Sequence, residues 1–267
     1  MLQEKGWVCD VFSGVESDPS IDTVRKGAAF MQEKQPDWII GLGGTSSIDA
    51  AKAMWVLYEH PELPFETMIK PFAIPALRNK ARFVAIPTTS GTGTETTSLA
   101  VITDRVKGVK YPIASHELQP DLAIVDGDLC QSMPADVTAN TGMDALTHCI
   151  EAYVSNVEDN YADAFAKGGI QLIFANLKNA VENPDNLTYR QNMHDASALA
   201  GYAFTNSWLG IVHSMAHQMG AIFGIPHGRA NALALPNVMR YNAKATDRFE
   251  DLANCWGFLL PASLSRL

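Results

Sequence analysis

Apolar positions in the first half of the chain follow two patterns in alternation. Short continuous apolar runs, which are typical of strands, occur at 6–12, 37–44, 99–104 and 121–126 and from residue 82 onward. Between them, apolar residues at helical spacing predict helices at 17–35 and 46–60, the first with Ile21, Val24, Ala28 and Met31 on one face. Strands that alternate with helices favour a parallel sheet covered by helices.

Strand patterns stop near residue 132, and long amphipathic stretches follow. These stretches, each typical of a helix, lie at 134–155, 160–183, 191–208, 210–224 and 229–257. The sequence therefore predicts an α/β domain over residues 1–132 and an all-α domain over residues 133–267. It contains no internal repeat and no low-complexity segment.

The amino-acid composition argues against two classes of binding partner. The 267 residues are 47% hydrophobic and carry a net charge of −9, without a run of Lys and Arg. Because an acidic protein repels phosphate groups, nucleic acid and anionic membranes are not expected as partners. The longest apolar runs are shorter than the ~20 residues that a membrane helix needs.

The cysteines and the N-terminus indicate a compartment. Cys9, Cys130, Cys149 and Cys255 are scattered and form no C-x-x-C pair, which disfavours a zinc ribbon or a disulfide framework. The N-terminus lacks the basic stretch and apolar core of a secretory signal. We therefore expect a reduced, cytoplasmic protein.

The first glycine loop, GLGGTSSID at 41–49, follows a predicted strand and opens a predicted helix. Backbone N–H groups at such a helix start can hold a phosphate. The loop departs from G-x-G-x-x-G, since Ser46 stands at the third glycine. A tight strand-to-helix turn explains the same residues equally well. Asp49 and Lys52 follow in the helix, where a solvated face would explain them unless the loop binds a ligand.

The second loop, PTTSGTGTE at 87–95, has five hydroxyl side chains and two glycines after a predicted strand. Ligands bind outside the carboxyl ends of the strands in open parallel sheets, so two such loops together are more specific than one. The alternative is a polar surface loop. Lys110 follows a predicted turn, where it would reach a ribose or phosphate or simply add to solubility.

The helical half holds a candidate metal site. Asp144 and His148 are four residues apart on one predicted helix face, as are His213 and His217. His227 follows after Gly224 and Pro226, where the chain can turn back. One carboxylate and three imidazoles suit a divalent metal. Alternatively, Asp144 complements the helix N-terminus, and each histidine is a satisfied core residue.

Four stretches together resemble the iron-containing (group III) alcohol dehydrogenases: GLGGTSSIDAAKA, IPTTSGTGTE, TGMDALTHCIEAY and GIVHSMAHQMGAIFGIPHGRANALALPNVMRYNA. The resemblance runs from about residue 11 to about residue 257. It implies the dehydroquinate synthase-like architecture, with a Rossmann-like dinucleotide-binding α/β domain before an all-α metal-binding domain. It also implies hydride transfer between NAD or NADP and a small primary alcohol bound to Fe(II), or the reverse reduction of an aldehyde.

The resemblance assigns roles to particular residues. Fe(II), which Zn(II) or another divalent ion can replace, would be held by Asp144, His148, His213 and His227. His217 would relay a proton or orient a ligand. The cofactor would contact Gly43, Gly44, Thr45, Ser46 and Asp49 of the first loop and helix, Thr88, Thr89 and Thr92 of the second loop, and Lys110. A homo-oligomer, with a dimer favoured, is expected.

The chain also departs from the family's pattern. Thr45 and Ser47 replace a glycine and a proline, so Thr45 must take an ordinary φ if the loop is to bind pyrophosphate. Asp18 stands where an asparagine is common. Relatives begin earlier and continue as further helices, whereas this chain ends in FLLPASLSRL, so truncation at both ends is expected. The alternative hypothesis is thus an inactive relative that retains metal or cofactor binding. A third hypothesis, a metal hydrolase, is disfavoured by the two glycine loops.

Overall fold

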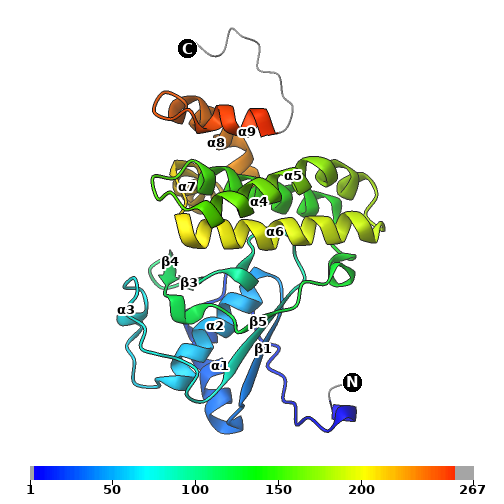
Figure 1. Cartoon of the computed structure of the whole chain (residues 1–267). Coiled ribbons are helices and arrows are strands. Elements are labelled where there is room, and N and C mark those ends of the chain that lie inside the picture. Colours follow the sequence, from blue (N-terminus) through cyan, green and yellow to red (C-terminus); the bar gives the residue numbers. More distant parts are fainter. Residues whose placement is uncertain (1–2, 256–267) are drawn as a thin grey trace. The chain divides into compact units, whose positions relative to one another are not determined.

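The computed structural model describes residues 3–255 and divides into two compact units (Figure 1). The α/β unit comprises Met1–Pro87 and Ser98–Ile124, and the helical unit comprises Thr88–Thr97 and Val125–Leu267. The second glycine loop therefore packs with the helices, although the sequence places it in the first domain. The domain boundary at 132 stays a prediction.

The α/β unit contains a parallel sheet, as predicted. Its strands are β1 (Trp38–Gly43), β2 (Arg82–Pro87) and β5 (Leu122–Ala123), in the order β1-β2-β5. β1 and β2 pair in register from Trp38 opposite Arg82 to Gly43 opposite Pro87. The carboxyl ends of these two strands therefore lead side by side into the two glycine loops.

The strand predicted at 99–104 forms, but it lies outside the parallel sheet. β3 (Leu99–Asp104) pairs antiparallel with β4 (Val109–Ala114) in a separate two-stranded sheet. The turn between them includes Gly108, whose φ of 66° suits glycine. A tight hairpin of this kind can only be antiparallel, which is why the pair does not extend the parallel sheet.

Among the described residues of this unit, three α-helices accompany these strands: α1 (Ile21–Lys34), α2 (Thr45–Glu59) and α3 (Phe65–Met68). α2 packs against β1, β2 and β3, and its Trp55 ring stacks on Phe83 of β2 with centroids 5.3 Å apart. Asp49 and Lys52 of α2 are buried, so the solvated face considered for them is wrong. Asp49 accepts a hydrogen bond from the Val101 N–H (2.8 Å) and Lys52 donates one to the Leu99 carbonyl (2.9 Å), which ties α2 to β3.

The strand predicted at 6–12 is wrong. These residues form no strand, and the side chains of Trp7, Val8 and Val11 are exposed. A strand needs a hydrogen-bonded neighbour, and within residues 3–255 no strand pairs with this segment.

The helical unit is built on three long helices that pack against one another: α4 (Ala135–Tyr153), α5 (Asn160–Glu182) and α6 (Leu187–Ser207). α7 (Ile211–Phe223) and α8 (His227–Asn242) pack on each other, and α8 also contacts α4. Gly224 ends α7 in the left-handed region with a φ of 65°, and Pro226 precedes α8. This bend brings the start of α8 back toward α7, as the glycine and proline predicted.

The last described helix is α9 (Arg248–Cys255). The end of the predicted 229–257 stretch and the closing FLLPASLSRL lie outside the described residues. Among residues 3–255, none of the helices combines the length and the apolar run needed to cross a bilayer.

Candidate metal centre

The predicted donor residues gather inside the helical unit. α4 carries Asp144 and His148 one turn apart, and both are buried, as is His213 near the start of α7. His227 is the first residue of α8, and its side chain is 37% exposed. The cluster therefore has three buried members and one that borders solvent.

The donor atoms converge on one point. Oδ1 of Asp144 lies 3.9 Å from Nε2 of His148, 3.6 Å from Nε2 of His213 and 3.4 Å from Nε2 of His227. A metal with bonds of ~2.0–2.2 Å spaces neighbouring ligand atoms roughly 3–3.6 Å apart. One ligand atom from each of Asp144, His148 and His213 lies within 4.8 Å of the other two. The residues present thus fit a divalent ion.

The electrostatics of the cluster favour a cation. Burial acts to raise the pKa of Asp144, but the charges and hydrogen bonds of His148, His213 and His227 outweigh it and hold the pKa well below its ordinary value. Burial lowers the pKa of His148 to about 3 against the opposing effect of Asp144. Burial also acts to lower the pKa of His213, but Asp144 and Glu151 raise it to about 9. The two buried carboxylates, Asp144 and Glu151, form an environment that a positive charge stabilises, either the proton on His213 or a metal ion.

Two neighbours of the cluster were missed by the sequence analysis. Glu151 of α4 accepts a 2.6 Å hydrogen bond from Nδ1 of His213, and Asn231 of α8 donates one of 2.7 Å to Oδ1 of Asp144. Glu151 follows Asp144 by seven residues and Asn231 follows His227 by four, so helical spacing from the predicted ligands would have found both.

His217 lies at the solvent side of the cluster. Its side chain is exposed, and its ring stacks on that of His227 with centroids 5.1 Å apart. The ring of His213 is farther, at 6.4 Å. His217 thus contacts both solvent and His227, a predicted ligand.

The first glycine loop turns directly from β1 into α2. Gly43 has a φ of 141°, and a side chain there would press on Ser47, with its Cβ 2.7 Å from Oγ. Gly44 is the N-cap of α2 and Thr45 its first helical residue. Thr45 is not among the residues with positive φ, so it takes the ordinary φ that the sequence analysis required.

Lys110 and Asp18 form an ion pair beside the first loop. Nζ of Lys110 lies 2.6 Å from Oδ1 of Asp18, and the Asp18 N–H donates to Oγ of Ser46 at 3.2 Å. Asp18 has a φ of 54°, a conformation uncommon outside glycine. Asp18, which stands where asparagine is common in the family, thus links Lys110 to Ser46.

The second glycine loop is anchored on α6. Ser90 shares a 2.9 Å hydrogen bond with Nδ1 of His194, the Gly93 N–H donates to Oγ of Ser197 at 3.1 Å, and the Thr96 hydroxyl donates to the Ala198 carbonyl at 3.0 Å. Residues 93–98 are buried, so a merely polar surface loop is wrong for this part. The three predicted cofactor contacts, Thr88, Thr89 and Thr92, remain half-buried.

Comparison with known proteins identifies the family. Residues 1–127 match the family described as iron-containing alcohol dehydrogenase, and residues 138–263 match its C-terminal domain. The crystal structure of an iron-containing alcohol dehydrogenase from Thermococcus thioreducens has a TM-score of 0.89 and 36% identity, covering 96% of this chain and 68% of that one. The chain belongs to the iron-containing alcohol dehydrogenase family.

Two relatives illustrate the range within this alcohol dehydrogenase family. The NADPH-dependent butanol dehydrogenase of Clostridium saccharobutylicum is 51% identical over 253 residues, which is 94% of this chain and 65% of the relative. The 1-propanol dehydrogenase of Salmonella typhimurium is 46% identical over 93% of this chain and 64% of its own length. The chain therefore spans just under two thirds of these relatives.

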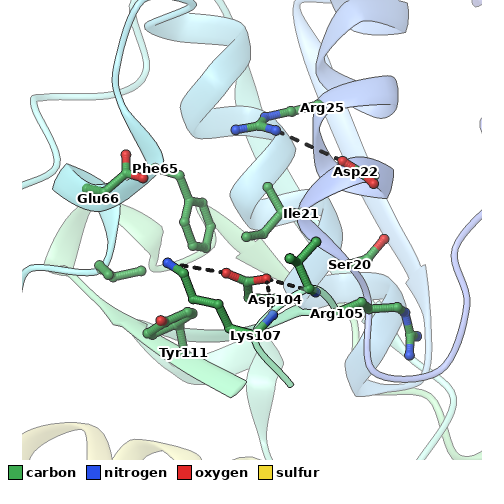
Figure 2. A pocket seen from close by; sticks show the side chains of 12 residues that line it. Ser20, Ile21, Asp22, Arg25, Phe65, Glu66, Asp104, Arg105, Lys107 and Tyr111 are labelled. Atoms are coloured by element: carbon green, nitrogen blue, oxygen red, sulfur yellow. Dashed lines mark hydrogen bonds and ion pairs between the residues drawn. The ribbon is translucent and has the colours of Figure 1, made fainter. Parts of the chain in front are cut away.

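A pocket lies in the α/β unit of this alcohol dehydrogenase family member (Figure 2). It has a volume of about 280 Å³ beside the start of α1 and the turn of the β3–β4 hairpin. Four of its charged side chains form two ion pairs, Arg25 with Asp22 at 3.9 Å and Lys107 with Asp104 at 3.5 Å. No residue of the histidine cluster or the glycine loops lines it, so it is not part of the candidate site.

Proposed function

We propose that the chain binds Fe(II), or another divalent ion such as Zn(II), and catalyses the NAD- or NADP-linked oxidation of a small primary alcohol and the reverse reduction of an aldehyde. The convergence of Asp144 Oδ1 with three imidazole Nε2 atoms carries the proposal. The names of relatives, a butanol and a propanol dehydrogenase, support the substrate class.

Asp144, His148, His213 and His227 would hold the metal. When bound, the metal would supply Lewis acidity toward the substrate oxygen, and the nicotinamide would supply the hydride acceptor or donor. Asp144 contributes the negative charge that offsets the ion, and the three histidines contribute neutral nitrogen donors. His227 borders solvent, which leaves one side of the site open to a small substrate.

His217 would carry a proton between the site and solvent or hold the His227 ring in place. Its exposed ring, stacked on His227, supports both roles. A relay requires reach to solvent and to the site, whereas an orienting role requires only the contact with His227.

The cofactor would be held by the two glycine loops. Gly43, Gly44, Thr45 and Ser46 lie at the start of α2, where backbone N–H groups and the helix dipole favour a pyrophosphate. Thr88, Thr89 and Thr92 would contact the cofactor from the second loop. Lys110 would contact the ribose once its ion pair with Asp18 is broken. Asp49 would support the cofactor site by holding α2 against β3, because its carboxylate already accepts the Val101 N–H.

The proposal is tested by activity and binding together. The purified chain, loaded with Fe(II) or Zn(II) in separate preparations, is assayed for NADH- and NADPH-dependent reduction of butanal, with His213→Ala as the metal-site control. Aldehyde reduction that needs metal and His213 supports the proposal. Metal or cofactor binding without turnover would instead support the inactive relative, and metal binding without cofactor binding would favour a hydrolase. The expected dimer is measured by light scattering on the same preparations.

A further inference from the structure

The Glu151 carboxylate is buried against the candidate metal centre without being a candidate ligand. It lies on α4, seven residues after Asp144 and therefore on the same helix face. Only 3% of Glu151 is exposed, and its Oε2 lies 2.6 Å from Nδ1 of His213. A buried carboxylate costs free energy unless it is fully hydrogen-bonded, so its partners indicate its role.

Glu151 also completes the N-terminus of α7. Its Oε1 accepts the Val212 N–H at 2.7 Å and its Oε2 accepts the His213 N–H at 3.3 Å. The N-cap residue of α7 is Gly210, which has no side chain to cap the helix. A Cβ at Gly210 would lie 2.7 Å from Oε1 of Glu151, so glycine lets the carboxylate approach. The same side chain thus fixes both the backbone and the ring of His213.

We infer that Glu151 is the positioning residue that fixes the rotation and tautomer of His213, so that Nε2 is the atom presented to the metal. A ring that donates its Nδ1–H to Glu151 keeps its free lone pair on Nε2. That Nε2 is the atom that faces Oδ1 of Asp144, at 3.6 Å. Carboxylates behind metal-bound histidines act in this way in other metalloproteins. The inference rests on the proposed metal site.

The isosteric variant Glu151→Gln breaks this arrangement for a specific reason. Glutamine has one acceptor and one donor end. If its NH₂ takes the place of Oε1, it opposes the Val212 N–H. If its NH₂ faces Nδ1 of His213, the ring must carry its proton on Nε2, which blocks the metal. Neither orientation satisfies both sets of contacts.

The test is the Zn(II) affinity of the full chain, measured by competition with a chromophoric chelator. We expect Glu151→Gln to bind Zn(II) about 10- to 100-fold more weakly than the wild type, as is typical when the outer partner of a ligand is lost. In the zinc-loaded wild type, long-range ¹H–¹⁵N NMR should find the His213 proton on Nδ1. An Nε2 proton there would overturn the inference.

Asp159→Asn is the matched control. Asp159 caps α5 by accepting the Ala162 N–H at 2.7 Å and contacts none of the candidate ligands. Glu151→Gln should lower the melting temperature of the metal-free protein, whereas Asp159→Asn should change it little, because asparagine caps a helix about as well as aspartate. Only Glu151→Gln should lower the Zn(II) affinity. Equal affinities in the wild type and Glu151→Gln would overturn the positioning role and leave the proposed function intact.

Two other outcomes are also decisive. A wild-type chain that binds no Zn(II) would overturn the proposed metal site and this inference with it. If Glu151→Gln does not fold, Gly210→Ala tests the inference instead. It keeps the charge of Glu151, but its new Cβ displaces the carboxylate by pressing on Oε1. A weaker Zn(II) affinity in Gly210→Ala supports the inference, and an unchanged affinity overturns it.

Discussion

Nδ2 of Asn231 donates a 2.7 Å hydrogen bond to Oδ1 of Asp144, in the buried centre of the histidine cluster. The same amide nitrogen lies 3.3 Å from Nε2 of His213 and 3.4 Å from Nε2 of His227. Asn231 and His227 are one turn apart on α8. The amide therefore holds the Asp144 carboxylate at the point where the three helices α4, α7 and α8 contribute their donors.

The first prediction concerns this amide. Asn231→Ala should weaken Zn(II) binding about 10-fold or more, because the Asp144 carboxylate loses the donor that fixes its orientation. The measurement is equilibrium competition with a chelator. Asn176→Ala is the matched control: Asn176 is also buried, but it bonds the Leu172 carbonyl and Asn192 instead of a candidate ligand. A loss of affinity in both variants, or in neither, would contradict the prediction.

The second prediction separates two stacked histidines. His227→Ala should lower the Zn(II) affinity by more than the roughly 10- to 100-fold typical of an outer partner, because it removes a proposed ligand. His217→Ala should still bind one metal ion per chain, because its ring lies on the solvent side of His227. If His217 relays a proton, its loss should reduce kcat about 10²-fold or more. Metal analysis and steady-state kinetics check both parts, and a metal-free His217→Ala protein would be evidence that His217 is a ligand.

Local sequence patterns predicted the structural features that depend only on residues close together along the chain. Helical spacing predicted that Asp144 and His148 share a face, and the bend at Gly224 and Pro226 predicted the return of His227. The pairing of β3 with β4 could not be read from LAVITD, because the apolar pattern does not distinguish a hairpin from a parallel sheet. The burial of Asp49 was likewise hidden, since its partner is the backbone of Val101, fifty-two residues away.

The second loop illustrates the same limit. Its hydroxyls and glycines predicted a polar loop after a strand, yet Gly93 is buried against α6, over a hundred residues later in the chain. The contact depends on the small residues Ser197 and Gly201 of α6. Their spacing alone does not indicate that a loop packs against them. Long-range packing therefore decides the environment of this loop.

The third prediction tests that packing. Gly93→Ala should destabilise the metal-free protein by about 2–3 kcal/mol or more, because Gly93 has a φ of 61° and its new Cβ would overlap the Ser197 carbonyl and lie 2.8 Å from Cα of Gly201. Gly224→Ala is the control, with a φ of 65° and no atom within 4 Å of the added Cβ. It should cost only about 1 kcal/mol from backbone strain. Urea unfolding of both variants measures the difference, and equal losses would argue against a tight loop–helix contact.

The last prediction concerns pH and the α/β unit. Glu59, at the end of α2, accepts the N–H groups of Asn79 (2.9 Å), Lys80 (3.1 Å) and Ala81 (3.2 Å) ahead of β2. Burial acts to raise the pKa of Glu59, but these N–H groups and Trp55 outweigh it, so the pKa lies below its ordinary value. The stabilisation from ionised Glu59 is therefore present above the unfolded-state pKa of about 4.3 and is lost as the pH falls through the lower folded-state pKa.

Glu59→Gln should consequently reduce the free energy of unfolding at pH 7 by about 1–3 kcal/mol, because one acceptor oxygen becomes a donor facing backbone N–H groups. The difference between wild type and variant should shrink as the pH falls from 7 toward 3, since the wild type then loses its own charged acceptor. Urea unfolding across this range measures it. Glu66→Gln, a change of the same kind in the first turn of α3, is the control for the loss of one negative charge. A constant difference between wild type and Glu59→Gln at every pH would mean that Glu59 is not held ionised by these contacts.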